Sequence, residues 1–371
     1  MRVLYALEWD VTSIGGVQTH VKYLAYYMKK LEDVNVLILT KSHKKIAYDT
    51  YIKAVTVDPI IPIEGIVIPP NPLKIKEILK KEKPDVIHAH HAFTSTSLLC
   101  LSFAEKLNIH RVLTNHSITI GYDYEVIWNF VSRTALSAYK YYISKAEAII
   151  SVSQAANRFI KPFTSRTSTK IVIPNGVDVY RFQPPKKEAL EPNILFVGRL
   201  VHRKGPHVLI KAFKEVVTEF PEAKLFIVGE GYMKPYLAYL AGKLNLKDKI
   251  RFLGSIPDNL LPKIYREAVL VTIPSLYSES FCIVAIEALA SGRPVVASNT
   301  GGLPEVVEND VCGFLVQPGN AKSLAGYISI ILSDHKLHLK LARNARKIAE
   351  QKYSWENITS KVYQVYESLL W

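Results

Sequence analysis

Short apolar runs alternate along the chain with longer segments in which apolar residues recur every three or four positions. The runs lie at residues 2–8, 34–39, 148–152, 194–197, 224–228 and 270–273. Between such runs, residues 17–30 and 208–220 each carry a single apolar stripe, which is typical of an amphipathic helix. Strands that alternate with helices predict an α/β protein built on parallel sheets.

A proline-rich, charged stretch at residues 183–193 interrupts this alternation. Its composition is typical of a linker, and a chain of 371 residues has room for about two domains of roughly 150 residues each. We therefore predict a first domain over residues 1–182 and a second domain over residues 194–353. Two such domains imply a cleft between them.

The most informative stretch is residues 275–305, which predicts a turn and then a helix that Gly292 and Pro294 end. Glu279 lies just before this helix, where backbone N–H groups are unpaired. Glu287 lies within the helix between apolar neighbours, so we expect it to be partly buried. Because helical side chains lean toward the N-terminus, Glu287 points back toward the region that Glu279 borders.

These two carboxylates admit two explanations. A helix N-terminus behind a parallel strand attracts anions, so two acids beside it suit a ligand with both phosphate and several hydroxyl groups, as in a nucleotide sugar. Alternatively, Glu279 is only a charge near a helix terminus and Glu287 is a surface residue. For an isolated pair of glutamates the second explanation would be favoured, so the neighbouring motifs decide.

Several motifs accompany the pair. They are Gly15-Gly16-Val17 with His20, His88-Ala89-His90, residues 173–178 (Ile-Pro-Asn-Gly-Val-Asp), Val197-Gly198-Arg199-Leu200, Arg203-Lys204-Gly205 and Gly301-Gly302-Leu303-Pro304-Glu305. Together with the Glu-x7-Glu spacing of Glu279 and Glu287, they resemble the retaining glycosyltransferases of family 4. The resemblance extends from about residue 2 to about residue 355.

The resemblance implies a fold and a reaction. The fold would be GT-B, with two doubly wound Rossmann-like domains facing a deep cleft and a last helix at about residues 354–371 that crosses back to the first domain. The reaction would be retaining transfer of a sugar from a nucleoside-diphosphate sugar. No residue stands out as a covalent nucleophile, which fits the front-face mechanism of this family.

The resemblance also assigns a donor site. A departing nucleoside diphosphate gains negative charge, and two cations beside it stabilise the transition state more than the ground state. Arg199 and Lys204 would bind this diphosphate, Glu279 the sugar hydroxyls and Glu287 the ribose hydroxyls. The full donor-binding set is Gly15, Gly16, Gly198, Arg199, Lys204, Gly229, Glu279, Ser280, Phe281, Cys282, Ile283 and Glu287.

Histidines follow two of the predicted strands. His116 comes after a strand at residues 111–114, where a doubly wound sheet presents groups to a ligand. A single histidine there is often structural, but the resemblance favours a role beside the donor sugar. His88 and His90 have a possible metal spacing, yet no third ligand is nearby in sequence, so we expect hydrogen bonding and no metal or cofactor. The predicted catalytic residues are His116, Glu279, Arg199 and Lys204.

One departure from the family pattern bears on the substrates. Cys282 occupies a position where the family commonly has glycine. The resulting Glu-x-Phe-Cys, with Thr-Asn-His-Ser at residues 114–117, resembles transferases that add N-acetylglucosamine to phosphatidylinositol. This favours UDP-N-acetylglucosamine over UDP-glucose or GDP-mannose, and a lipid-linked or glycan acceptor. A nucleotide-sugar epimerase with the GT-B fold and a non-catalytic nucleotide-sugar binding protein remain alternatives.

The net charge of +14 favours acidic partners. Residues 1–185 hold 23 Lys and Arg against 15 Asp and Glu, and no nucleic-acid motif is present. Residues 120–145 combine Tyr124 and Trp128 with Lys140 and other cations, which suits either an anionic membrane surface or a core helix.

The three cysteines and the apolar runs bear on location. Cys100, Cys282 and Cys312 are odd in number and widely spaced, which favours a reducing compartment. No apolar run reaches the roughly 18 residues needed to span a bilayer, and the first residues lead directly into a strand rather than a signal peptide. We therefore expect a cytoplasmic protein that attaches peripherally to the membrane.

Overall fold

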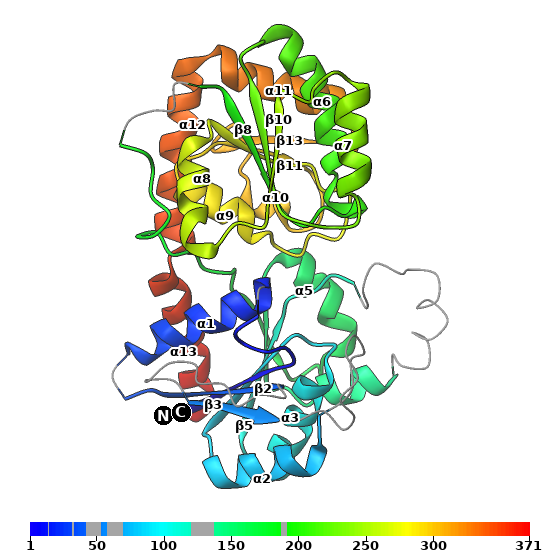
Figure 1. The fold of residues 1–371 in the computed structure, drawn as a ribbon. Helices are drawn as coiled ribbons and strands as arrows, with labels where there is room; N and C mark the ends of the chain where they lie inside the picture. The colour runs from blue at the N-terminus through cyan, green and yellow to red at the C-terminus, as the bar shows by residue number, and fades with distance from the viewer. Residues whose placement is uncertain (14, 32, 42–52, 58–69, 120–136, 187–190) are drawn as a thin grey trace. The chain divides into compact units, whose positions relative to one another are not determined.

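The computed structural model describes the chain except for residues 14, 32, 42–52, 58–69, 120–136 and 187–190. The described residues form two compact units (Figure 1). Unit 1 comprises Met1–Gly176 together with Trp355–Trp371, and unit 2 comprises Val177–Ser354. Residues 177–182, which the sequence prediction assigns to the first domain, lie in unit 2.

Unit 1 is built on one parallel sheet. Its strands are β1 (Arg2–Leu7), β2 (Asn35–Lys41), β3 (Lys53–Val57), β4 (Val86–His90), β5 (His110–Asn115), β6 (Ala148–Ser151) and β7 (Thr169–Val172). The strand order is β3-β2-β1-β4-β5-β6-β7. The chain therefore adds strands outward in one direction from β1 and then in the other direction from β4, as in a doubly wound sheet.

Helices cover both faces of this sheet. They are α1 (Gly16–Lys29), α2 (Pro72–Glu82), α3 (Ser95–Lys106), α5 (Gln154–Ile160) and α13 (Trp355–Leu370). Successive residues of β1 alternate between two cores because strand side chains alternate in direction: Val3 and Tyr5 pack with α1 and α13, whereas Leu4 and Ala6 pack with α2 and α3.

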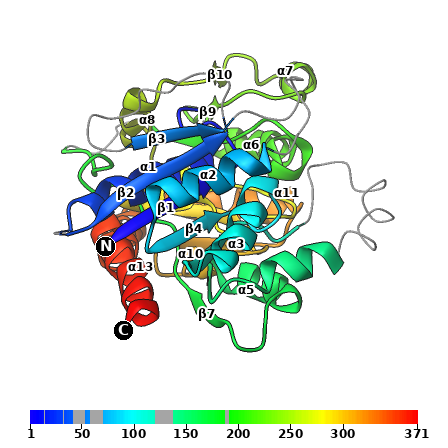
Figure 2. The same ribbon diagram turned by 90° about the horizontal axis from the view of Figure 1, so that it is seen from below.

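The last helix completes the core of unit 1. The buried side chains of α13, drawn in red in Figure 2, recur every three or four residues: Trp355, Ile358, Val362, Val365 and Tyr366. They pack with Val3 and Tyr5 on the α1 side of the sheet. The amphipathic pattern at the end of the sequence therefore forms part of a core whose other members lie more than 300 residues earlier.

Unit 2 repeats the architecture with six parallel strands. They are β8 (Asn193–Val197), β9 (Lys224–Val228), β10 (Ile250–Gly254), β11 (Leu270–Ile273), β12 (Val295–Ser298) and β13 (Gly313–Val316). Their order is β10-β9-β8-β11-β12-β13, so the direction changes between β8 and β11. The main helices are α6 (Pro206–Glu219), α7 (Lys234–Lys243), α8 (Leu261–Glu267), α9 (Ile283–Ala290), α10 (Leu303–Val306), α11 (Ala321–Ser333) and α12 (His335–Ile348).

The described helices include none that is both long and apolar enough to cross a bilayer. The aromatic segment predicted over residues 120–145 is described only from residue 137, where residues 137–143 are helical. Tyr124 and Trp128 lie outside the described residues.

Candidate functional site

The ends of β8, β9 and β11 bring the predicted donor motifs of unit 2 close together. Gly229 has a φ of +126°, and a Cβ there would lie 2.0 Å from the carbonyl oxygen of Gly198. Gly205 has a φ of +67°, and its Cβ would lie 1.9 Å from the carbonyl oxygen of Pro274. Only glycine fits these positions, so the glycines allow loops from separate strands to pack backbone against backbone.

Lys204 and Glu279 form the central contact. Lys204 ends a 3₁₀ turn (His202–Lys204) before α6, and Glu279 precedes α9. Lys204 Nζ lies 2.5 Å from Glu279 Oε1, and Ser275 Oγ donates a hydrogen bond of 2.8 Å to the same oxygen. The structure therefore brings together two of the predicted catalytic residues.

Glu279 is only 4% exposed. Burial alone would raise the pKa of its carboxyl group, but the Lys204 ammonium and the hydrogen bonds from Lys204 and Ser275 hold this pKa below its ordinary value. Arg203 Nη1 also lies 3.8 Å from Glu279 Oε1. Sequence reasoning did not assign Arg203 a role, although it stands next to Lys204 in the basic motif.

The backbone before α9 is shaped by an unusual residue. Cys282, the residue before the helix, has a φ of +80°, a region that L-residues other than glycine rarely adopt. The N–H of Gly302 donates a hydrogen bond of 2.7 Å to the carbonyl of Glu279, so the Gly301-Gly302 turn supports the same loop. Burial raises the pKa of the Cys282 thiol to about 12, and the carboxylates of Glu279 and Glu287 add to this effect.

Glu287 is half-buried within α9, as its apolar neighbours predict. Tyr265 on α8 donates a hydrogen bond of 2.8 Å to Glu287 Oε2. Burial raises the pKa of Glu287 to about 7, and the Tyr265 hydroxyl partly offsets this rise. Sequence reasoning missed Tyr265, because only the fold brings this α8 residue next to α9.

The remaining predicted donor residues surround these groups or lie in unit 1. Arg199 follows β8 and is exposed, while Ser280, Phe281 and Ile283 belong to the loop and first turn of α9. Gly15 and Gly16 lie in unit 1 at the start of α1.

His116 belongs to a cluster of histidines in unit 1. It follows β5, and its Nε2 lies 3.4 Å from Nδ1 of His90 at the end of β4. His20 on α1 completes the cluster, with its ring centroid 4.9 Å from that of His116. Burial lowers the pKa of His20 to about 4 and those of His90 and His116 well below the ordinary value. All three rings are therefore neutral at pH 7.

His88 hydrogen-bonds through both ring nitrogens, as its position at the strand end suggested. Its Nδ1 lies 2.5 Å from the Tyr366 hydroxyl and its Nε2 lies 2.6 Å from Thr114 Oγ1. The histidines that converge are thus His20, His90 and His116, whereas sequence spacing had suggested His88 with His90.

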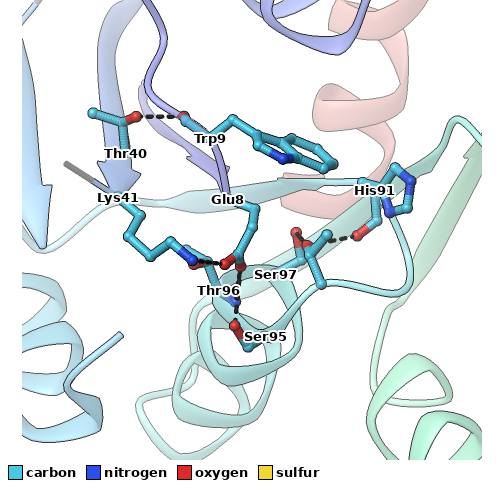
Figure 3. Close-up of polar contacts among 9 residues, drawn as sticks. Glu8, Trp9, Thr40, Lys41, His91, Ser95, Thr96 and Ser97 are labelled. Atoms are coloured by element: carbon cyan, nitrogen blue, oxygen red, sulfur yellow. Dashed lines mark hydrogen bonds and ion pairs between the residues drawn. The ribbon is translucent and has the colours of Figure 1, made fainter. Parts of the chain in front are cut away.

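A buried carboxylate at the same edge of the sheet was not predicted. Glu8 follows β1 and accepts hydrogen bonds from Ser95 Oγ (3.0 Å) and Thr96 N (2.8 Å) at the start of α3, and it also pairs with Lys41 (Figure 3). Glu8 thereby caps α3, whose own N-cap residue, Thr94, supplies no side-chain cap. The available signal was an acidic residue directly after a buried strand.

Comparison with known proteins identifies the family. The family model for Glycosyltransferase Family 4 matches residues 14–181, and the model for Glycosyl transferases group 1 matches residues 179–348. An uncharacterized glycosyltransferase of Methanocaldococcus jannaschii is 35% identical over 306 residues, which cover 78% of this chain and 77% of that protein. The chain belongs to glycosyltransferase family 4.

Other relatives of this glycosyltransferase have more specific names. A phosphatidyl-myo-inositol mannosyltransferase of Mycolicibacterium smegmatis is 30% identical, with 100% of this chain and 94% of that protein covered. One component of the phosphatidylinositol N-acetylglucosaminyltransferase of Arabidopsis thaliana is 25% identical, with 100% and 82% covered.

Solved structures resemble this glycosyltransferase over its whole length. The sucrose-phosphate synthase of Thermosynechococcus elongatus has a TM-score of 0.82 at 24% identity, covering 100% of this chain and 98% of that chain. Anabaena HepE in complex with UDP has a TM-score of 0.82 at 24% identity, covering 99% and 100%. The predicted GT-B fold, with two doubly wound α/β units, is confirmed.

Proposed function

We propose that this glycosyltransferase is a retaining enzyme that moves N-acetylglucosamine from UDP-N-acetylglucosamine to a lipid-linked acceptor of the phosphatidylinositol type. The observation that carries the proposal is the contact between Lys204 Nζ and the buried Glu279 carboxylate, at 2.5 Å, in the loop before α9. A cation and an acid at this point suit a ligand that has a diphosphate beside a sugar.

The charges of the site suggest how donor binding proceeds. Without donor, Lys204 neutralises Glu279, which would otherwise be a buried unpaired charge. An entering diphosphate brings negative charge that Lys204 and Arg199 attract, and Glu279 then accepts hydrogen bonds from the sugar hydroxyls. Ser275 still donates to Glu279 in this arrangement, so the carboxylate keeps a partner throughout.

Bond cleavage transfers negative charge to the diphosphate, and the same cations stabilise that charge without a metal ion. In the front-face mechanism the leaving phosphate oxygen takes the proton of the acceptor hydroxyl, so no protein nucleophile is required. Glu287 would accept hydrogen bonds from the ribose hydroxyls while Tyr265 holds its second oxygen. His116 would lie beside the donor sugar.

Names of relatives support the choice of substrates. Both the Arabidopsis and the Mycolicibacterium relatives act, by name, on phosphatidylinositol, and the Anabaena structure was solved with UDP. The Glu-x-Phe-Cys motif that ends at Cys282 favours N-acetylglucosamine over mannose.

Donor binding is tested first by thermal shift with UDP-N-acetylglucosamine, UDP-glucose, GDP-mannose and UDP. A ligand at 100 times its Kd stabilises the folded protein by about 2.7 kcal/mol. Transfer is then followed with labelled donor and phosphatidylinositol vesicles, and the anomeric configuration of the product is read by NMR. Binding without transfer or donor hydrolysis would instead indicate a non-catalytic binding protein.

Lys204→Ala and Arg199→Ala should each lower kcat by about two to three orders of magnitude, as expected when one electrostatic contact to the transition state is lost. Lys214→Ala is the matched control, because Lys214 is an exposed lysine on the neighbouring helix α6. Near-normal turnover in either site variant, with a normal melting temperature, would show that the donor diphosphate binds elsewhere.

A further inference from the structure

Three imidazoles from three separate elements converge in unit 1. His20 projects from α1, His90 is the last residue of β4, and His116 follows β5. One ring nitrogen of each lies within 4.8 Å of the corresponding nitrogens of the other two. β4 and β5 are neighbouring parallel strands, so the cluster lies at the carboxyl edge of the sheet.

The nitrogens of this cluster lack ordinary partners. Both ring nitrogens of His20 and Nε2 of His90 are buried without a hydrogen bond. A buried polar atom left unpaired costs about 1–3 kcal/mol, so such atoms in a native protein call for an explanation, and a bound ion is one of the recognised ones. A cation that accepts their lone pairs would satisfy them.

The spacing matches a metal site. His90 Nδ1 and His116 Nε2 are 3.4 Å apart, which is long for a hydrogen bond. Two ligands of a tetrahedral zinc ion, with Zn–N distances of about 2.0–2.1 Å, lie about 3.3 Å apart. The third nitrogen, from His20, needs only a small rotation of its ring to reach the same point.

The surrounding rings hold the cluster in place. His90 stacks on His88 with centroids 4.2 Å apart and meets the edge of Tyr5 at 5.4 Å. His20 meets Trp355 at 5.4 Å. Ligands that are locked by packing bind a metal with less loss of conformational freedom.

We propose that His20, His90 and His116 form a binding site for a divalent transition-metal ion such as Zn²⁺, and that occupation of this site inhibits the enzyme. Three neutral imidazoles suit Zn²⁺, Co²⁺ or Ni²⁺, whereas Mg²⁺ and Ca²⁺ prefer oxygen ligands. Since His116 is only half-buried, the fourth coordination position is left for water. The inhibitory role rests on the proposed function, because the ion would remove His116 from the donor sugar.

The site is tested by titrating the EDTA-treated full-length protein with Co²⁺ and Zn²⁺. We expect one ion per chain, visible absorption bands typical of four-coordinate Co²⁺, and loss of these bands when Zn²⁺ is added. His20→Gln and His116→Gln should each weaken Zn²⁺ binding more than about tenfold in calorimetry. Circular dichroism checks that both variants fold, and His116→Gln, at the least buried of the three positions, disturbs packing least.

His207→Gln is the matched control, because His207 stacks on His202 at 4.9 Å in unit 2, away from the cluster. It should bind Zn²⁺ as tightly as the native protein does. Absence of stoichiometric Co²⁺ binding, or equal binding by both cluster variants, would overturn the site.

The Co²⁺ spectrum does not depend on turnover, so a failure of the proposed function would leave this result readable. Transfer should be inhibited over the Zn²⁺ range in which the site fills and should return on addition of EDTA. Full transfer by the zinc-loaded protein would overturn the inhibitory role.

Discussion

Glu279 and Glu287 lie at the two ends of one loop-and-helix segment, yet their environments have opposite effects. Lys204 and Ser275 contact Glu279 and hold its pKa below the ordinary value. Glu287 has a tyrosine hydroxyl as its neighbour and no cation within salt-bridge distance among the described residues, and burial raises its pKa to about 7. Carboxyl groups whose pKa values are pushed apart in this way are typical of functional sites.

Glu287→Gln should raise the free energy of unfolding at pH 8 and reduce donor affinity. The folded-state pKa of about 7 lies above the ordinary 4.5, so the stability that the protonated group contributes is fully present below pH 4.5 and lost as the pH rises through 7. The loss amounts to at most about 3 kcal/mol at pH 8. Glutamine cannot ionise, so it avoids this loss.

Melting temperatures of both proteins at pH 5 and pH 8 measure the effect. The gain from Glu287→Gln should be larger at pH 8 than at pH 5. Glu215→Gln, at an exposed position on α6, is the control and should show no such difference. An equal effect at both pH values would mean that Glu287 titrates normally.

The Glu-x7-Glu spacing and its basic partners were readable from the sequence because motif and chemistry coincide within short segments. The Tyr265–Glu287 and Glu8–Thr96 contacts were not, since each joins residues that only the fold brings together. The φ of +80° at Cys282 was also hidden, because a cysteine gives no signal for the left-handed region.

At the scale of elements, α13 depends on one close approach. A Cβ on Gly176 would lie 2.4 Å from Cδ2 of Trp355, the residue that begins α13 and contacts His20. The chain thus leaves unit 1 at Gly176 directly against the point where it returns at Trp355.

Gly176→Ala should lower the melting temperature of the protein, because overpacking a core contact costs about 1–3 kcal/mol. Gly326→Ala on α11 is the matched substitution: nothing lies within 4 Å of its Cβ position, so alanine should stabilise the helix by up to about 1 kcal/mol. Calorimetry of the two variants should therefore show shifts of opposite sign. A Gly176→Ala protein as stable as the native one would contradict the contact.

Most elements of both sheets follow from periodicity, because parallel strands buried on both faces are continuous apolar runs. Residues 177–182 show the limit of this reasoning. Arg346 on α12 donates hydrogen bonds to the carbonyls of Val179 (3.0 Å), Phe182 (2.7 Å) and Ala290 (2.7 Å). An arginine more than 160 residues away therefore ties this segment to unit 2, which no local pattern could predict.

At the scale of the whole molecule, the net charge of +14 makes contact with an acidic surface favourable. Lysines and arginines contribute about 1 kcal/mol each near anionic lipid. The native protein should therefore sediment with vesicles that contain acidic lipid at low salt, and roughly 0.5 M salt should release it because ions screen the attraction. Neutral vesicles are the control. No association at low salt would direct the search for the acceptor toward soluble sugars.

Unit 1 is discontinuous in sequence, and this sets the order in which the protein is completed during synthesis. Residues 355–371, which supply Trp355 and Tyr366 to its core, are translated only after all of unit 2. At about 5–20 residues per second, the ribosome needs roughly ten to thirty-five seconds to make the intervening segment. During that time the α1 side of the first sheet stays uncovered, so unit 2 should become protease-resistant on the ribosome before unit 1. Stalled chains ending near residue 354 would show the reverse order if α13 were dispensable for the first core.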